Sequence, residues 1–160
     1  MSKWIIVHCE YGRLGNRLHT HANALAWCIN NDFNLLNLSF TDYAPFFKSN
    51  RKNEPAMLIS KSGFFAYLFS LKCIQRFLKK LCMSDKWLKR MSLIINTYIR
   101  EGDDPLNEHD LDLSLQKSRK IKVIRAWNLN CPKSLIKNKC LIREFLKPND
   151  IYIEKAFEQI

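Results

Sequence analysis

A glycine turn at residues 11–18 constrains this 160-residue chain more than any other feature, because it separates an apolar run from a helical pattern. The run at residues 4–8 is short and rich in β-branched residues, which favours a buried strand. From Leu14 to about Asn31 apolar residues recur at steps of three and four, which predicts a helix. The order of strand, glycine turn and helix is typical of the first unit of a parallel α/β sheet.

The two glycines of this turn, Gly12 and Gly15, allow the backbone to pass close to a ligand and to direct unpaired N–H groups at an anion. Arg13 and Arg17 add guanidinium groups and Asn16 adds an amide, a set that suits a diphosphate and a polar sugar. The turn is not a P-loop, because no Lys-Ser or Lys-Thr follows it, and it lacks the G-x-G-x-x-G of dinucleotide-binding folds. Asn16 has a second interpretation as a helix cap, which needs no ligand.

The remainder of the chain alternates between strand and helix patterns, which predicts an α/β fold with a Rossmann-like parallel sheet flanked by helices. A single domain is expected for residues 1–160, since this length is near the usual size of a domain. We predict strands at 3–9, 33–40 and 120–127, helices at 62–83, 134–145 and 148–160, and a further helix and strand within 85–98. Turns or loops are expected at 41–54, 101–112 and 129–133, and the second of these holds six acidic residues.

The chain carries a formal net charge of +11, which implies an anionic partner such as a phosphorylated molecule, a membrane surface or nucleic acid. Within the predicted helix at 62–83, the basic residues Lys72, Arg76, Lys79 and Lys80 fall on one face. Lys72 and Arg76 interrupt the apolar run well before the length that spans a bilayer. The second candidate function is therefore a non-catalytic basic module that binds an anionic membrane or, less favoured as a partner, nucleic acid.

No metal site or cofactor is expected. The six cysteines form no C-x-x-C pair and have no histidines at metal-ligand spacing, so we interpret them as reduced core thiols. Asp110-Leu111-Asp112 matches the D-x-D of metal-dependent transferases, but no buried strand precedes it. His19 and His21 point in different directions on a helix, and we expect one to face a cleft and the other the surface. The absence of a signal peptide before Trp4 favours a cytoplasmic protein.

Four groups of residues resemble the amino-terminal end of fucosyltransferase-like glycosyltransferases: Gly12-Arg13-Leu14-Gly15-Asn16-Arg17-Leu18, Ala22-Asn23-Ala24-Leu25-Ala26, Leu35-Leu36-Asn37, and Tyr43 with Phe46-Phe47. That family opens with a G-[GR]-[LF]-G-N-[QR] loop after its first strand, and residues 124–127 and 142–148 are similar to a second landmark of its bacterial members. The resemblance implies a two-domain GT-B-like fold and metal-independent transfer of fucose from GDP-fucose to a glycan acceptor. It implies that Gly12 and Gly15 give close backbone approach, while Arg13 and Asn16 face the donor. A peripheral position at the inner membrane face is also expected.

The family's H-x-R-x-G-D segment, whose arginine stabilises the leaving diphosphate, is absent from these residues, and Arg100-Glu101-Gly102-Asp103 lacks the histidine. The resemblance therefore implies an amino-terminal half that is inactive alone and needs a separate carboxy-terminal half. A helix start contributes about 0.3–1 kcal/mol to anion binding, whereas micromolar affinity requires about 8 kcal/mol. The turn is thus expected to form one wall of a donor site, and no catalytic residue is assigned.

Overall fold

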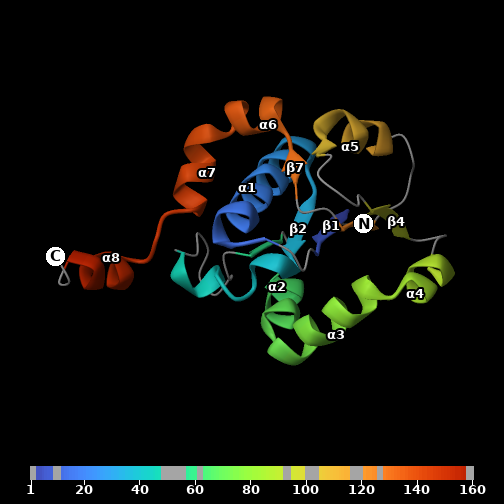
Figure 1. Ribbon diagram of the computed structural model, residues 1–160, viewed down its shortest axis with the longest axis horizontal. Coiled ribbons are helices and arrows are strands. Elements are labelled where there is room, and N and C mark those ends of the chain that lie inside the picture. The colour runs from blue at the N-terminus through green and yellow to red at the C-terminus, as the bar shows by residue number, and fades with distance from the viewer. Residues whose placement is uncertain are drawn as a thin grey trace.

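The computed structural model describes residues 3–8, 12–47, 57–60, 63–91, 95–99, 105–115, 121–125 and 128–157. It is a mixed α/β structure in which a sheet of five strands in the order β3-β2-β1-β6-β4 is flanked by helices (Figure 1). This confirms the predicted α/β class with a parallel sheet. The loop expected at 48–54, Cys9 and the segment Arg100 to Asp103 lie outside the described residues.

Strand β1 (Trp4–Val7) is the centre of the sheet and pairs in parallel on both sides. Its neighbours are β2 (Asn34–Asn37) and β6 (Ile121–Arg125), and β4 (Ile95–Ile99) extends the parallel pairing beyond β6. The short β3 (Leu58–Ile59) pairs with β2 in the antiparallel sense. A strand with neighbours on both edges and helices on both faces must be apolar throughout, which explains the unbroken apolar run of β1.

One face of the sheet is covered by α1 (Leu14–Asn31), whose bounds are those predicted from its apolar spacing. Ala24, Leu25 and Trp27 of this helix are buried against β1 and β2. Its last turn ends at Asp32, which adopts a left-handed conformation with φ of 60° and donates its N–H to the carbonyl of Cys28. The helices α6 (Pro132–Lys137) and α7 (Lys139–Phe145) pack beside α1 on this face (Figure 1).

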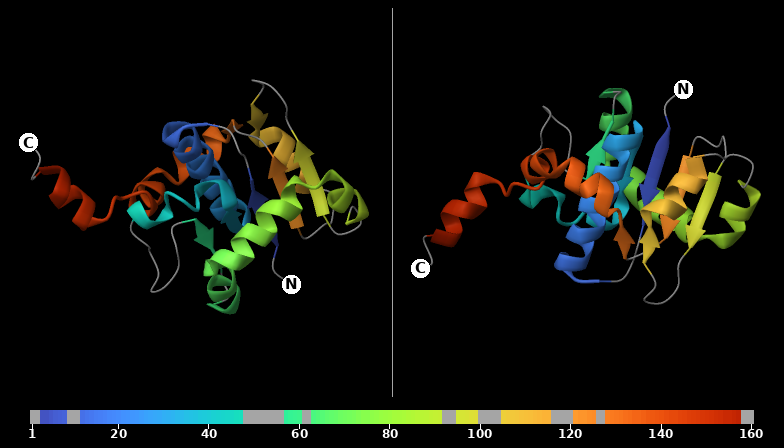
Figure 2. Two further views of the ribbon diagram at one scale, coloured as in Figure 1. Left: turned by 60° about the horizontal axis from the view of Figure 1, so that its bottom comes forward. Right: turned by 90° about the horizontal axis from the view of Figure 1, so that it is seen from above.

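The opposite face is covered by α3 (Lys72–Met83) and α4 (Asp85–Arg90), with α2 (Gly63–Ser70) at the end of α3 (Figure 2). Cys82 and Leu88 are the buried anchors of α3 and α4, and they pack with Leu36 and Val123 of the sheet. Two short 3-10 helices, η1 (Leu38–Phe40) and η2 (Ala44–Phe46), follow β2 and complete this layer. No helix in the described part of the chain is long and apolar enough to cross a membrane.

The prediction of a single helix at 62–83 is wrong, because the helix is interrupted at Leu71, between α2 and α3. Leu71 has an extended backbone with φ of −71° and ψ of 122°. The Gln75 side chain donates to the carbonyls of Phe69 and Ser70 at 2.9 and 3.2 Å, so the end of α2 is satisfied by a side chain instead of by further helix. All four basic residues of the predicted face therefore belong to α3 alone.

The helix expected at 134–145 is likewise two helices, α6 and α7, joined at Asn138. It begins earlier than predicted because Pro132 stands in the first turn, where a missing N–H costs nothing. The turn expected at 129–133 holds a short strand, β7 (Leu129–Asn130), which pairs in parallel with β5 (Leu106–Asn107). The last helix, α8 (Asp150–Phe157), points away from the body of the molecule (Figures 1 and 2).

The acidic segment expected to be a loop or linker at 101–112 is instead ordered structure over its described part, comprising β5 and α5 (Glu108–Leu115). Glu108 is buried, and its carboxylate accepts the backbone N–H groups of Lys133 and Ser134 at 3.0 and 3.1 Å and the Ser134 hydroxyl. It thereby caps α6 from a different segment of the chain. A carboxylate stabilises the N-terminus of a helix. The sequence did not indicate this contact, because Glu108 lies 25 and 26 residues before the N–H groups that it accepts.

The expectation that the cysteines are core residues is partly wrong. Cys28, Cys82 and Cys131 are buried and free, but Cys73 and Cys140 are free and exposed. Burial raises the pKa of the Cys82 thiol to about 11, with a smaller opposing effect from Arg125, and burial also raises the pKa of Cys28 and Cys131. The buried thiols are therefore protonated at neutral pH and poor nucleophiles.

Glu108→Gln is predicted to lower the free energy of unfolding by about 1–3 kcal/mol. The substitution replaces one of the two carboxylate oxygens, each of which accepts a backbone N–H, with an NH2 group that cannot accept one. Urea denaturation followed by circular dichroism measures the change. The matched control is Glu144→Gln on the exposed surface of α7, which should change stability by no more than about 0.5 kcal/mol. Equal effects of the two substitutions would contradict the capping role of Glu108.

Candidate functional site

The candidate site lies at the carboxyl ends of the parallel strands. The chain crosses from β1 to β2 on one side and later returns to β6 on the other side of β1. In open parallel sheets this change of direction leaves a crevice at the carboxyl ends of the two diverging strands, and ligands bind there. His8 directly follows β1 at this position and donates its backbone N–H to the Ile124 carbonyl of β6 at 2.9 Å.

The glycine turn connects this edge to α1. Gly12 has a φ of +96°, a conformation that L side chains rarely adopt, and a Cβ added there would lie 3.0 Å from the Cβ of Asn16. Gly15 differs, because a Cβ added to it would meet no described atom within 4 Å beyond its chain neighbours and the backbone of α1. The turn geometry therefore requires glycine at position 12 only. At position 15 the open space over the first turn of α1 has no packing explanation.

The start of α1 is not capped by Asn16, so the cap interpretation of that residue is wrong. The N-cap is Arg13, with φ of −76° and ψ of 175°, and it makes no side-chain cap hydrogen bond. The first turn contains no acidic residue. Arg13, Gly15 and Asn16 are all exposed at this helix start, where the partial positive charge of the helix is not offset by a carboxylate of its own.

Arg17, predicted to contact a ligand, forms hydrogen bonds that hold the glycine turn in place. Its Nε donates to the Gly12 carbonyl at 3.0 Å and its Nη1 donates to the Ser39 carbonyl at 3.1 Å. The guanidinium also lies 5.6 Å from the centre of the Tyr43 ring. Arg17 therefore ties the glycine turn to the segment that follows β2, and it contributes positive charge from a fixed position.

The two histidines of α1 have separate surroundings. His21 is fully buried, where its ring stacks on Phe40 at 4.3 Å and its Nδ1 lies 3.1 Å from the Asn37 amide. It is part of the core, so the expectation of a cleft-facing residue is wrong for His21. His19 is exposed on the surface, as expected for one of the pair.

The basic face of α3 lies at the same edge of the sheet as the glycine turn. Lys79 donates from Nζ to the Thr41 hydroxyl at 2.7 Å. Since Arg17 bonds to Ser39, two residues before Thr41, both predicted groups of basic residues contact the one short segment after β2. From the sequence, the arginines of the glycine turn and the basic residues of α3 supported two alternative functions. In the structure both groups lie at the same segment.

Two adjoining pockets share Lys79. The first, which we call the α3 pocket, has a volume of about 370 Å³ and is lined by Thr41, Asp42, Pro45, Lys72, Gln75, Arg76 and Lys79. The second, the β1 pocket, has a volume of about 410 Å³ and is lined by His8, Lys79, Lys80, Met83 and Ser84. The predicted basic residues Lys72, Arg76, Lys79 and Lys80 thus all line pockets. Both volumes suit a small ligand.

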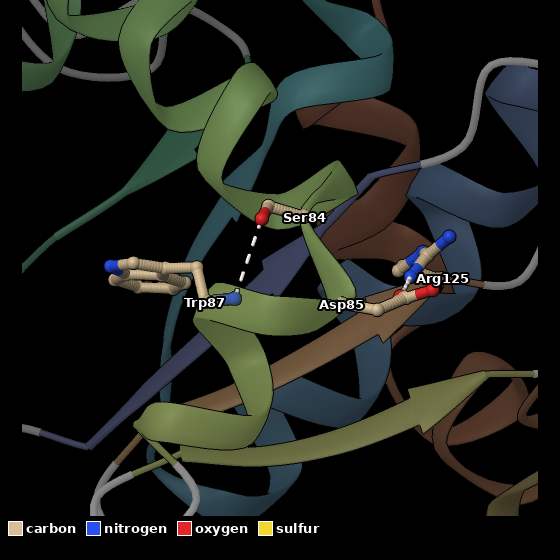
Figure 3. Close-up of polar contacts among 4 residues, drawn as sticks. All are labelled: Ser84, Asp85, Trp87 and Arg125. Atoms are coloured by element: carbon tan, nitrogen blue, oxygen red, sulfur yellow. Dashed lines mark hydrogen bonds and ion pairs between the residues drawn. The ribbon is translucent and has the colours of Figure 1, made fainter.

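The far end of the β1 pocket is held by the junction of α3 and α4 (Figure 3). The Ser84 hydroxyl accepts the Trp87 N–H at 3.3 Å and caps α4. Asp85 forms an ion pair with Arg125 at the end of β6. These contacts attach the carboxyl end of α3 to the sheet, so the lysines of α3 are carried on an anchored helix.

The two carboxylates of the D-x-D motif, Asp110 and Asp112, each accept a hydrogen bond from the chain itself. The Asp112 carboxylate accepts from Trp27 Nε1 at 2.9 Å, and the Asp110 carboxylate accepts from the Asn107 N–H at 3.2 Å. Leu111 between them is buried. Among the described residues no group of three or more His, Cys, Asp or Glu side chains is arranged to hold a metal ion.

Sequence reasoning missed His8, Thr41 and Asp42 as lining residues of the site. Thr41 and Asp42 were assigned only to a turn, because nothing local in the sequence indicates that α3 returns over that turn. The position of His8 at the end of the central strand was a usable signal, since strand ends at this edge are where ligands bind.

Comparison with known proteins gives no match to a family model, to a curated protein or to a solved structure.

The two glycines of the turn are predicted to respond to alanine in opposite directions. Gly12→Ala should lower the free energy of unfolding by about 1–2 kcal/mol, because of its positive φ and the close Asn16 side chain. Gly15→Ala should raise it by about 0.5–1 kcal/mol, because it lies in α1 and has open space around it. Urea denaturation of both variants measures this. Destabilisation by Gly15→Ala would contradict the account of that position.

Proposed function

We propose that this chain contributes the amino-terminal wall of a nucleotide-sugar site in a fucosyltransferase-like glycosyltransferase with a Rossmann-like, GT-B-type fold. The observation that carries the proposal is Gly15, a glycine in a helix start, where an added Cβ would meet no described atom within 4 Å beyond its chain neighbours and the backbone of its own helix. It stands at the carboxyl edge of the central strand, beside exposed Arg13 and Asn16. Space, unpaired N–H groups and positive charge at one point suit a diphosphate.

The proposed roles follow from the geometry. The first-turn N–H groups of α1 and the Arg13 guanidinium contact the donor diphosphate, and the Asn16 amide contacts a polar group of the nucleotide sugar. Arg17 holds the turn in place through the carbonyls of Gly12 and Ser39 and adds long-range attraction. The proposal assigns binding to these residues, and it assigns the transfer step to none of them.

The expected affinity of this wall alone is low. A helix start contributes about 0.3–1 kcal/mol, and a charge-assisted hydrogen bond contributes about 1.5–3 kcal/mol. One of each, with a few weaker contacts, amounts to about 4–5.5 kcal/mol, which is a dissociation constant of roughly 0.1–1 mM. We therefore propose weak binding of GDP-fucose by these 160 residues and no turnover by them alone.

Asn16→Asp is predicted to separate binding from stability. A carboxylate in the first turn of α1 should stabilise the helix by about 0.3–1 kcal/mol, yet it should repel a diphosphate and weaken GDP-fucose binding by about tenfold. Isothermal titration calorimetry with GDP-fucose, GDP and free fucose, together with urea denaturation, measures both effects.

Arg13→Gln should weaken GDP-fucose binding by a similar factor, whereas the matched control Arg143→Gln on exposed α7 should leave it unchanged. GDP alone should retain most of the affinity, and free fucose should show none. The proposal fails if wild-type protein shows no saturable binding of GDP-fucose up to about 10 mM, or if both arginine variants bind alike.

A further inference from the structure

The α3 pocket is lined by several like charges, whose mutual repulsion does not help α3 to fold. Lys72, Arg76 and Lys79 lie along one side of α3 at spacings of four and three residues, where like charges repel. Helix α3 has no acidic residue in its first turn, and its N-cap, Leu71, makes no side-chain hydrogen bond. The start of this twelve-residue helix therefore adds partial positive charge at the Lys72 end of the pocket.

The pocket also contains two polar side chains, Lys79 and Gln75, that are held in position by hydrogen bonds. Lys79 is held by the Thr41 hydroxyl at 2.7 Å, so it is directed along the segment after β2. Gln75 is held through its Nε2 by the carbonyls of Phe69 and Ser70, which leaves its amide oxygen as a separate polar group. Asp42 is the one carboxylate among the described lining residues, where it stands against three cations. A solvated face would need neither the cavity nor a lysine held at its wall.

We propose that the α3 pocket binds a phosphate or diphosphate group, separately from the glycine turn. Its volume of about 370 Å³ accommodates such a group together with part of the molecule that carries it. Arg76 supplies a planar fork of donors for phosphate oxygens, and Lys72 and Lys79 supply point charges on either side of it. None of the described lining residues belongs to the glycine turn, so substitutions in the pocket and in the turn test the two sites separately.

The phosphate has two chemical sources, a free phosphorylated molecule or a lipid headgroup. Exposed aromatic side chains on α3 and on the helix before it give the lipid source a physical basis: Phe64 and Tyr67 of α2 are 69% and 68% exposed, and Phe77 of α3 is 59% exposed. Aromatic residues beside lysines and arginines are typical of helices that lie in a membrane interface. The same pocket chemistry serves both sources, and the experiment distinguishes them.

Inorganic pyrophosphate is the probe for the free source. Isothermal titration calorimetry should give saturable binding that weakens about tenfold in Arg76→Gln and in Lys72→Gln, because each loses a charge-assisted contact. Asp42→Asn should strengthen binding several-fold by removing from the lining a carboxylate that repels the anion. A gain of affinity cannot result from misfolding. The control Lys139→Gln, which removes a charge from exposed α7, should have no effect.

Vesicles of phosphatidylglycerol and phosphatidylcholine are the probe for the lipid source, and sedimentation of the protein with them measures binding. Loss of sedimentation in Arg76→Gln, together with a gain in Asp42→Asn, assigns the pocket to a headgroup. Pyrophosphate binding with the same pattern assigns it to a free phosphate. The proposal is overturned if neither probe binds, or if Arg76→Gln and Lys139→Gln behave alike. Arg13→Gln should leave pyrophosphate binding at the pocket intact, which separates this outcome from failure of the donor proposal.

Discussion

The structure depends on the burial of β1 between two parallel neighbours. Because β2 and β6 flank β1 on opposite sides, every backbone group of β1 is committed to the sheet and its side chains meet helices on both faces. The chain can leave this strand only at its carboxyl end, and it must turn at once to start α1. Gly12 makes that turn possible through its positive φ. The location of the site follows from this one constraint.

The segment after β2 joins the two halves of the site. The Ser39 carbonyl accepts a hydrogen bond from Arg17 of α1, and the Thr41 hydroxyl accepts one from Lys79 of α3. Helices on opposite faces of the sheet therefore both contact a stretch of three residues. Phe40 between them is buried against His21, which fixes the stretch to the core. Positive charge from two distant parts of the sequence is thereby concentrated at one edge. The donor and phosphate proposals concern neighbouring parts of this edge.

The sequence predicted the parts of the fold whose signals are local. The apolar spacing of α1 marked both of its ends, and the apolar runs marked β1 and β6. It failed where side-chain contacts outside the apolar pattern decide the structure. Glu108 caps a helix some 25 residues away, and Gln75 bonds to the last carbonyls of α2 although the apolar pattern continues past them. The site followed the same division. The glycine turn was visible from its spacing, whereas the two pockets depend on how α3 packs over Thr41 and His8.

The central claim is that ligands bind at the carboxyl edge of the sheet, and mapping by two-dimensional amide NMR tests it most directly. Addition of GDP-fucose to ¹⁵N-labelled protein should shift the amides of residues 12–18 and of the adjoining segment 38–43, while those of α7 stay fixed. Shifts centred on the opposite edge, around Asp32 and Asn34, or no shifts at saturating ligand, would contradict the account.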